Sequence, residues 1–219
     1  MTYTELKAAI IAYTENQGFT ATDLATFTKQ AEQRIYNSVQ IANLRKNVTG
    51  VLSSGNKYLA CPTDYLSSYS LAVYPFISTT ATGTAGQSTI VVASASGIVV
   101  GQYAAGSNIG TEAVVTLIVG TTITLSVANS GTVSGTITFQ GDYTYLLNKD
   151  VNFIREVYPN PRDIALPKYY AIFGPQSVND AELSFILGPT PDANYYAELH
   201  YYYYPPSIVT VNTKKRWAC

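Results

Sequence analysis

The residues best suited to acid–base chemistry lie in the stretch Tyr195–Tyr204, which contains His200, the only histidine of the chain. Glu198 stands two residues before it. Because alternate residues of a strand share a face, both side chains would point to one side, where a carboxylate beside an imidazole can act as a general base. No nucleophile motif accompanies them, neither GxSxG nor a cysteine near a second histidine. The stretch is therefore better interpreted as a strand that faces another surface.

Other chemical motifs are also missing from the sequence. It has no P-loop, no dinucleotide-binding glycine fingerprint, no HExxH and no EF-hand loop. Cys61 and Cys219 form no CxxC pattern, and Lys214–Arg216 reads most simply as a solvated tail. The carboxylates considered as metal ligands lack the required spacing: Asp142, Asp150, Glu156 and Asp163. The sequence therefore predicts a protein that is not an enzyme and that uses no cofactor or metal.

The composition favours a protein that covers its surface with other proteins. Only 12% of the residues are charged, against roughly 25% in ordinary soluble proteins, and there are 19 tyrosines. Tyrosine is enriched at interfaces, where its ring is buried and its hydroxyl stays hydrated. No apolar run approaches the roughly 20 residues that span a membrane. The N-terminus also lacks the basic and apolar regions of a signal peptide, which favours assembly in a reducing cytoplasm.

Two helices are expected at the N-terminal end. The first covers residues 3–17, with Thr2 and Glu5 as a capping box, and the second runs from Thr20 or Thr22 to Val39. Their apolar stripes are interpreted as core faces, with a groove for a partner helix as the alternative. The stripe residues are Leu6, Ile10 and Tyr13 in the first helix, and Leu24, Phe27, Ala31 and Ile35 in the second.

The strands follow in two groups, separated by an unusual segment. A hairpin is expected over 48–60 and a strand over 67–74. Residues 77–140 contain one charged residue, Glu112, and are otherwise rich in threonine, valine and glycine, which predicts a small β-sandwich or barrel. Afterwards come a helix within 148–158 and a meander of strands at 168–173, 182–187 and 195–204.

The predicted fold class is α+β, with N-terminal helices and antiparallel strands interrupted by a small all-β insertion that resembles a sandwich or barrel. Residues 1–76 and 141–219 form the expected core domain, and residues 77–140 the insert. The predicted interface residues lie in the tyrosine-rich strand and in the insert: Tyr196, Tyr201, Tyr202, Tyr203, Tyr204, Tyr103 and Phe139.

Several segments resemble one known family. They are the helix pair from Thr4 to Tyr36, the run from Tyr58 to Tyr65, Val151–Pro159 followed by Pro167–Ala171, and Tyr196–Tyr202. Together they resemble the head-to-tail adaptor (connector) proteins of short-tailed bacteriophages, over most of the chain outside the insert.

The resemblance implies a structural virion protein located in the tail or neck and assembled in the host cytoplasm. Members of that family form a dodecameric ring beneath the portal and connect it to the tail nozzle. Double-stranded DNA passes through the ring without specific binding, and tail fibres can attach to it. The insert would, by the same resemblance, project outward and dock a fibre or a nozzle protein.

One feature departs from the family pattern. Family members usually continue past the tyrosine-rich strand into further helices that contact the portal, whereas this sequence ends at Cys219. Two interpretations stay open: another protein supplies the packing, or the reading frame ended early.

Two other functions compete with the adaptor. A glycan- or receptor-binding virion protein would use the insert as its module, with Tyr103, Phe139, Asn108 and Asn129 as candidate contacts. A hydrolase would be built around Glu198 and His200.

Overall fold

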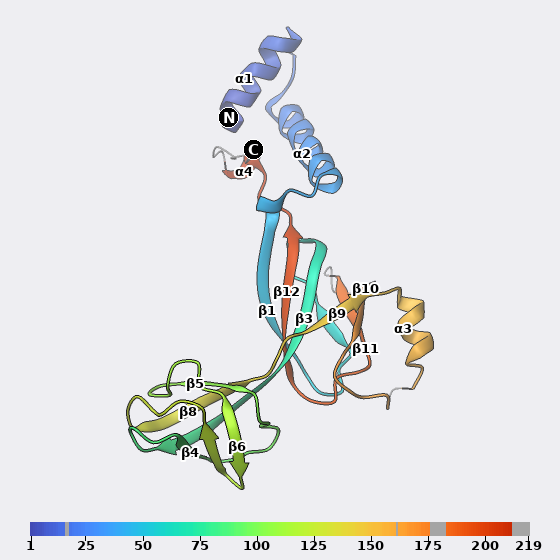
Figure 1. Ribbon diagram of the computed structural model, residues 1–219. Coiled ribbons are helices and arrows are strands. Elements are labelled where there is room, and N and C mark those ends of the chain that lie inside the picture. Colours follow the sequence, from blue (N-terminus) through green and yellow to red (C-terminus); the bar gives the residue numbers. More distant parts are fainter. Residues whose placement is uncertain (16–17, 161, 176–182, 212–219) are drawn as a thin grey trace. The chain divides into compact units, whose positions relative to one another are not determined.

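The computed structural model describes residues 1–15, 18–160, 162–175 and 183–211 (Figure 1). The chain divides into two compact units. The first comprises residues 1–47, residues 62–69 and the chain from His200 onward; the second comprises residues 48–61 and 70–199. The contacts therefore group residues 141–199 with the insert, and the sequence-based boundaries at 77 and 140 stay a prediction.

The expected N-terminal helices are present in the first unit. Helix α1 spans Tyr3–Thr14 and helix α2 spans Ala21–Ser38. Each begins with a capping box, in which the hydroxyl of Thr2 or Thr20 accepts a hydrogen bond from the backbone N–H three residues later. The short helices η1 (Ala42–Leu44) and α4 (Ile208–Val211) complete the helical part. The basic tail at 214–216 lies outside the described residues.

The predicted core stripes are largely wrong. No residue of α1 is buried, and the buried side of α2 consists of Leu24, Thr28, Glu32 and Tyr36 rather than the apolar stripe around Phe27 and Ile35. The cause is local packing. Tyr36 packs against Tyr204, and Glu32 accepts a hydrogen bond from the Ile208 N–H, so polar residues turn inward.

Three long strands contribute to both units: β1 (Arg45–Leu52), β3 (Tyr65–Gly83) and β12 (Tyr195–Tyr203). Strand β12 pairs with β1 and with β3. The turn expected near Gly55 exists, since Asn56 N–H donates to Ser53 O at 3.1 Å. The prediction of a hairpin over 48–60 is nevertheless wrong, because β2 (Tyr58–Ala60) pairs with β11 and β1 pairs with β12.

The second unit holds a mixed sheet in the order β2-β11-β10-β9-β3. Its further strands are β9 (Thr144–Asn148), β10 (Tyr169–Gly174) and β11 (Ser184–Gly188). Strands β9 and β10 are parallel and joined through helix α3 (Val151–Val157), which packs on β10 and β11. Of the meander expected at 168–173, 182–187 and 195–204, the antiparallel pairing of β10 with β11 is confirmed, but the third strand, β12, pairs with β1 and β3 rather than with β11. Strand β9 was not expected, and the crossover helix makes its pairing with β10 parallel.

The insert also belongs to the second unit and continues directly from β3. It contains β4 (Thr89–Val92), β5 (Tyr103–Gly106), β6 (Val115–Val119), β7 (Thr122–Leu125) and β8 (Val133–Gln140). Pairing runs from β3 to β4, β7 and β6, and from β3 to β8 and β5. The bridge Tyr103–Val114 and the bond from Val115 N–H to Gln102 O, at 2.9 Å, join β5 to the start of β6. The strands thus close into a small barrel.

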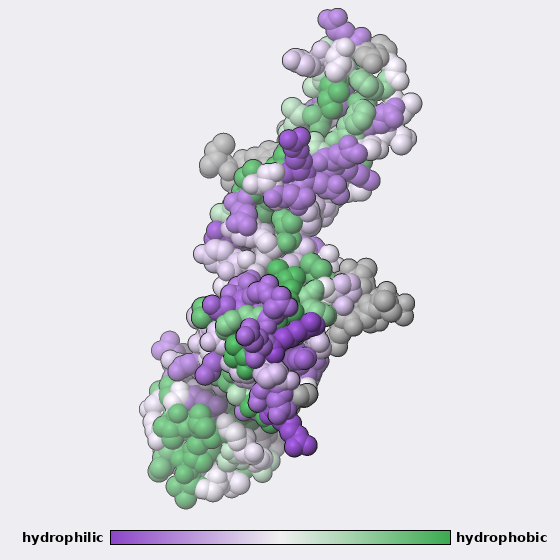
Figure 2. All heavy atoms as spheres, turned by 90° about the vertical axis from the view of Figure 1, so that its right-hand side faces the viewer, coloured by the Kyte–Doolittle hydropathy of each residue, from purple (hydrophilic) through white to green (hydrophobic). Residues whose placement is uncertain are grey.

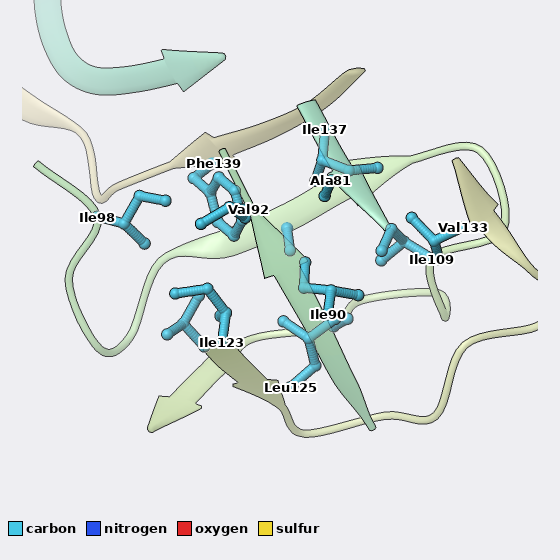
Figure 3. Close-up of a cluster of buried hydrophobic side chains, with 13 residues drawn as sticks. Ala81, Ile90, Val92, Ile98, Ile109, Ile123, Leu125, Val133, Ile137 and Phe139 are labelled. Atoms are coloured by element: carbon cyan, nitrogen blue, oxygen red, sulfur yellow. The ribbon is translucent and has the colours of Figure 1, made fainter. Parts of the chain in front are cut away.

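The barrel interior is a continuous apolar core (Figure 3). Inward residues alternate with outward ones along β4 and β7, as a strand with one buried face requires. Phe139, Ile123 and Ile90 are among the largest fully buried side chains. Burying each such side chain contributes roughly 1.5–3 kcal/mol, which lets the insert fold without charged pairs.

Candidate protein–protein interface

The inner face of β12 is packed within the protein. Tyr195, Ala197, Leu199 and Tyr201 are buried, which confirms the expected alternation as far as Tyr201, although Tyr202, expected on the opposite face, is buried as well. Tyr201 stacks on Tyr65 with ring centroids 6.1 Å apart, so its ring is committed to internal packing rather than offered to a partner.

The Tyr201 hydroxyl joins a small polar network around Asp64. It donates to Asp64 Oδ1 at 2.8 Å, while Lys46 Nζ lies 2.5 Å from Oδ2. Burial alone would raise the pKa of Asp64, but the hydrogen bonds from Lys46 and Tyr201 and the charge of Lys46 outweigh it, so the pKa is lowered. Burial and the bond to Asp64 in turn raise the pKa of Tyr201 to about 12. The network fixes the end of β12 against the turn before β3.

Tyr202 is held by an arginine. The Arg45 guanidinium lies 4.1 Å from the ring centroid of Tyr69 and 5.3 Å from that of Tyr202. Its Nε and Nη2 both donate to the Tyr202 hydroxyl, at 3.1 and 2.9 Å. Tyr202 is buried, whereas Tyr69 is 57% exposed. Tyr69 therefore carries the open side of this cluster, and the sequence alone does not single it out, because its exposure depends on how its strand pairs.

Tyr203 and Tyr204 are half-buried at the end of the strand region. Lys46 Nζ lies 4.0 Å from the ring centroid of Tyr203. The Tyr204 hydroxyl bonds to Asn37 Oδ1, and its ring packs edge-on against Tyr36. The Tyr204 ring therefore anchors helix α2, and both tyrosines leave only part of their surface for a partner.

Tyr196 belongs to an aromatic cluster in the second unit. Its ring centroid lies 4.1 Å from that of Phe76 and 5.8 Å from that of Tyr74. Tyr74 in turn packs against Tyr143, at 4.6 Å. Burial, followed by the neighbouring Tyr143 and Glu198, raises the pKa of Tyr74. Tyr143 is 43% exposed, so the edge of the cluster that it forms is open to contact.

The two aromatic candidates in the insert have different positions. Tyr103 is 52% exposed and is available for contact. Phe139 is completely buried in the barrel core, where it pairs with Ala104 on β5. Its assignment as an interface residue needs correction, because strand alternation directs its ring inward. This also leaves the sugar-binding interpretation without one of its two aromatic contacts.

His200 has a structural neighbour in Asn47, whose Nδ2 lies 3.2 Å from His200 Nε2. Three hollows identified in the described structure are lined by residues other than His200 and Glu198. Among the described residues, no group of histidines, cysteines and carboxylates could hold a metal ion. None of the described helices is long and apolar enough to cross a membrane.

An apolar groove lies between α1 and α2 in the first unit. It has a volume of about 410 Å³. Phe27 and Ile35 on its wall are 50% and 40% exposed. Its lining consists of Met1, Leu6, Ile10, Phe27, Thr28, Ala31, Glu32, Ile35 and Ile208. The apolar stripe of α2, whose periodicity predicts a core face, is thus mostly the open wall of this groove.

A second open surface is the outer face of β4, β7 and β6, here called the insert face. In the register of the sheet, Val91 of β4 and Val119 of β6 both pair with Thr122 of β7. Thr89 of β4 and Leu117 of β6 likewise both pair with Thr124 of β7. Val119 is 64% exposed, and none of these six residues is charged. Figure 2 shows hydrophobic residues gathered on the surface of the insert.

The described residues offer two open contact surfaces, the groove between α1 and α2 and the insert face, as a structural assembly protein requires. The comparison with protein families agrees: the SU10 adaptor protein family matches residues 1–218, and the chain belongs to that family. It is accordingly a phage head–tail adaptor, a structural protein of the virion, and its family is not one of enzymes. A search of curated proteins found no match.

Proposed function

We propose that the chain forms a ring, dodecameric in the intact virion, below the portal of a short-tailed phage and links the portal to the tail nozzle. The observation that carries this proposal is the family match over residues 1–218. Two open, largely apolar surfaces support it: the groove between α1 and α2, and the insert face. A ring of identical copies buries such surfaces in head-to-tail contacts.

The charge of the chain suits a ring through which DNA passes. Tight DNA binding requires many lysines and arginines that neutralise phosphates and release counterions. This chain has a net charge of −1. It would therefore hold DNA weakly and let it slide through the channel.

The insert is the proposed docking site for a tail fibre. Val91, Leu117 and Val119 expose roughly half or more of their surface on a face without charge. A partner with charged side chains at this face would lose their hydration without gaining a counter-charge. The partner surface should therefore be uncharged and rich in β-branched or aromatic residues.

The ring is tested by mixing the purified chain with the purified portal and imaging the mixture by negative-stain electron microscopy. The adaptor proposal predicts rings seated on the portal. A chain that stays monomeric and unbound at micromolar concentrations of both proteins would refute it.

Fibre docking is tested separately with matched lysine variants in assembled virions. Val119→Lys places a charge on the insert face, whereas Thr136→Lys places the same charge on β8, which lies across the barrel from β7. Both positions are exposed. Fibre content per virion should fall several-fold with Val119→Lys and stay at the wild-type level with Thr136→Lys. Equal fibre content in both would remove the insert face from the docking site.

A further inference from the structure

Strand β6 leaves one side of its backbone open along part of its length. The start of the strand is covered, because Val115 N–H donates to Gln102 O and Gly101 N–H donates to Val115 O, both at 2.9 Å. A register shift follows, and from Leu117 onward the pairing with β7 is regular. Here β7 is the only partner of β6 among the described strands. The side of residues 116–119 that faces away from β7 is called the β6 edge.

The hydrogen-bond pattern identifies the backbone groups that point to the β6 edge. Antiparallel pairs alternate between hydrogen-bonded and non-hydrogen-bonded ones. Leu125 N–H donates to Ser88 O at 2.7 Å, so the odd-numbered residues of β7 bond toward β4 and the even-numbered ones toward β6. Ile118 pairs with the odd-numbered Ile123. The N–H and C=O of Ile118 therefore point away from β7, and no loop or side chain among the described residues takes up either group.

Two other edge strands of the protein are protected, whereas the β6 edge is not. Unpaired backbone attracts further strands, so sheet edges are commonly guarded by charged side chains or kept very short. Among the described strands, β1 pairs only with β12 and carries Arg45 and Lys46, and β2 pairs only with β11 and has three residues directly after Lys57. Strand β6 contains no charge and no proline, and its Leu117 and Val119 are 54% and 64% exposed. Such an edge is normally covered when the protein is assembled.

The unpaired N–H and C=O of Ile118 require an extended strand as the occupant of the β6 edge. Pairing with the same edge of a second copy would be isologous and close as a dimer, whereas a ring uses heterologous contacts. Strand β1 of a second copy would bring Arg45 and Lys46 against Leu117 and Val119, where no opposite charge compensates for their lost hydration. The occupant should therefore be an uncharged strand of another protein.

We propose that a tail fibre protein adds one uncharged strand, with β-branched or aromatic residues at alternate positions, to the β6 edge. This inference rests on the proposed docking of a fibre at the insert and specifies how the contact is made. In such strand addition, main-chain hydrogen bonds hold the partner and side-chain contacts select it. Ile118 supplies the main-chain groups, and Leu117 and Val119 supply the side-chain contacts.

Hydrogen exchange of single backbone amides tests strand addition without a change of sequence. It is measured by mass spectrometry on the free chain, on particles without fibres and on particles that carry fibres. Leu117 N–H, which points to β7, should be protected in all three samples. Ile118 N–H should exchange about 100-fold more slowly in the fibre-bearing particles than in the other two samples, because only there does it bond to another strand.

A substitution at the same residue tests whether the outward N–H holds the fibre. Ile118→Pro removes this N–H and keeps the bonds of β6 to β7, since proline is tolerated on an edge strand where its nitrogen faces outward. Ile118→Ala is the matched control, because it shortens the side chain and keeps the N–H. Circular dichroism checks that both variants fold. Fibre content per virion should fall several-fold with Ile118→Pro and stay near the wild-type level with Ile118→Ala.

Three results would overturn the inference. The first is an Ile118 amide that exchanges equally fast with and without fibres. The second is an amide already protected in particles without fibres, which would show that a neighbouring copy covers the edge. The third is equal fibre content in the folded proline and alanine variants. In each case fibre docking at the insert face still stands if Val119→Lys lowers the fibre content. If neither Val119→Lys nor Ile118→Pro lowers it, the docking and the added strand fail together.

Discussion

Truncating Phe139 should destabilise the insert strongly, because its side chain is completely buried in the barrel core. Phe139→Ala removes the ring and leaves a cavity among neighbours such as Ile123. Substitutions of this kind cost about 3–5 kcal/mol. Since 1.36 kcal/mol corresponds to a factor of ten, opening of the barrel should become about 150- to 5,000-fold more frequent.

Native-state hydrogen exchange followed by mass spectrometry measures this opening directly. Amides of β3 and β8, which pair along the barrel from Phe76 to Gly83, should exchange faster in the variant by that factor. Amides of α2, in the other unit, should keep their wild-type rates.

Tyr103→Ala is the matched control, because Tyr103 lies on the neighbouring strand and is 52% exposed. Its exchange rates should change less than tenfold. If Phe139→Ala also changes the rates less than tenfold, Phe139 is not a core residue and the assignment of the barrel interior is wrong.

Three further predictions concern the first unit. The pKa of Asp64 is lowered from its ordinary 3.8, so its contribution to stability is present above that pH and is lost as the pH falls through the lower, folded-state value. Urea titrations of wild type and Asp64→Asn should therefore show a smaller difference in unfolding free energy at pH 2 than at pH 7. A difference that is equal at both pH values would contradict the contact with Tyr201. Arg45→Lys cannot make both hydrogen bonds to Tyr202 and should cost about 1–2 kcal/mol by urea unfolding, whereas an unchanged midpoint would show that the guanidinium adds nothing. Thr20→Ala removes the α2 cap and should cost about 1 kcal/mol in the same assay, with Thr20→Ser near wild type; equal loss in both would rule out capping as the cause.

Local features of the fold could be predicted from the sequence because local chemistry determines them. The capping boxes at Thr2 and Thr20 mark the true starts of α1 and α2. Strand alternation gave the buried side of β12, including Tyr201. The charge-poor composition of residues 77–140 predicted a small β-sandwich or barrel, and the strands there do close into a barrel.

Features that depend on distant partners could not be predicted. Strands β1 and β2 flank a turn, yet each pairs with a strand more than a hundred residues later in the chain. The apolar stripe of α2 reads as a core face because periodicity shows only that Phe27 and Ile35 share a side. Which side is covered depends on Ile208 and Tyr204, and these positions carry no local signal.

The candidate contact surfaces show the same difference between features set by local chemistry and features that depend on distant partners. The tyrosines of β12 were recognised as contact residues, but most of their contacts lie within the chain, as for Tyr202 with Arg45. The open surfaces are instead the groove between α1 and α2 and the insert face. They are defined by what the fold leaves uncovered, which requires the structure.

Cryo-electron microscopy of the intact particle tests the central claim most directly, namely that this adaptor works by contact with other proteins. The account predicts a ring of this chain between portal and tail, with the insert face against a second protein. An isolated subunit whose Glu198 and His200 converge on a bound small molecule would contradict it.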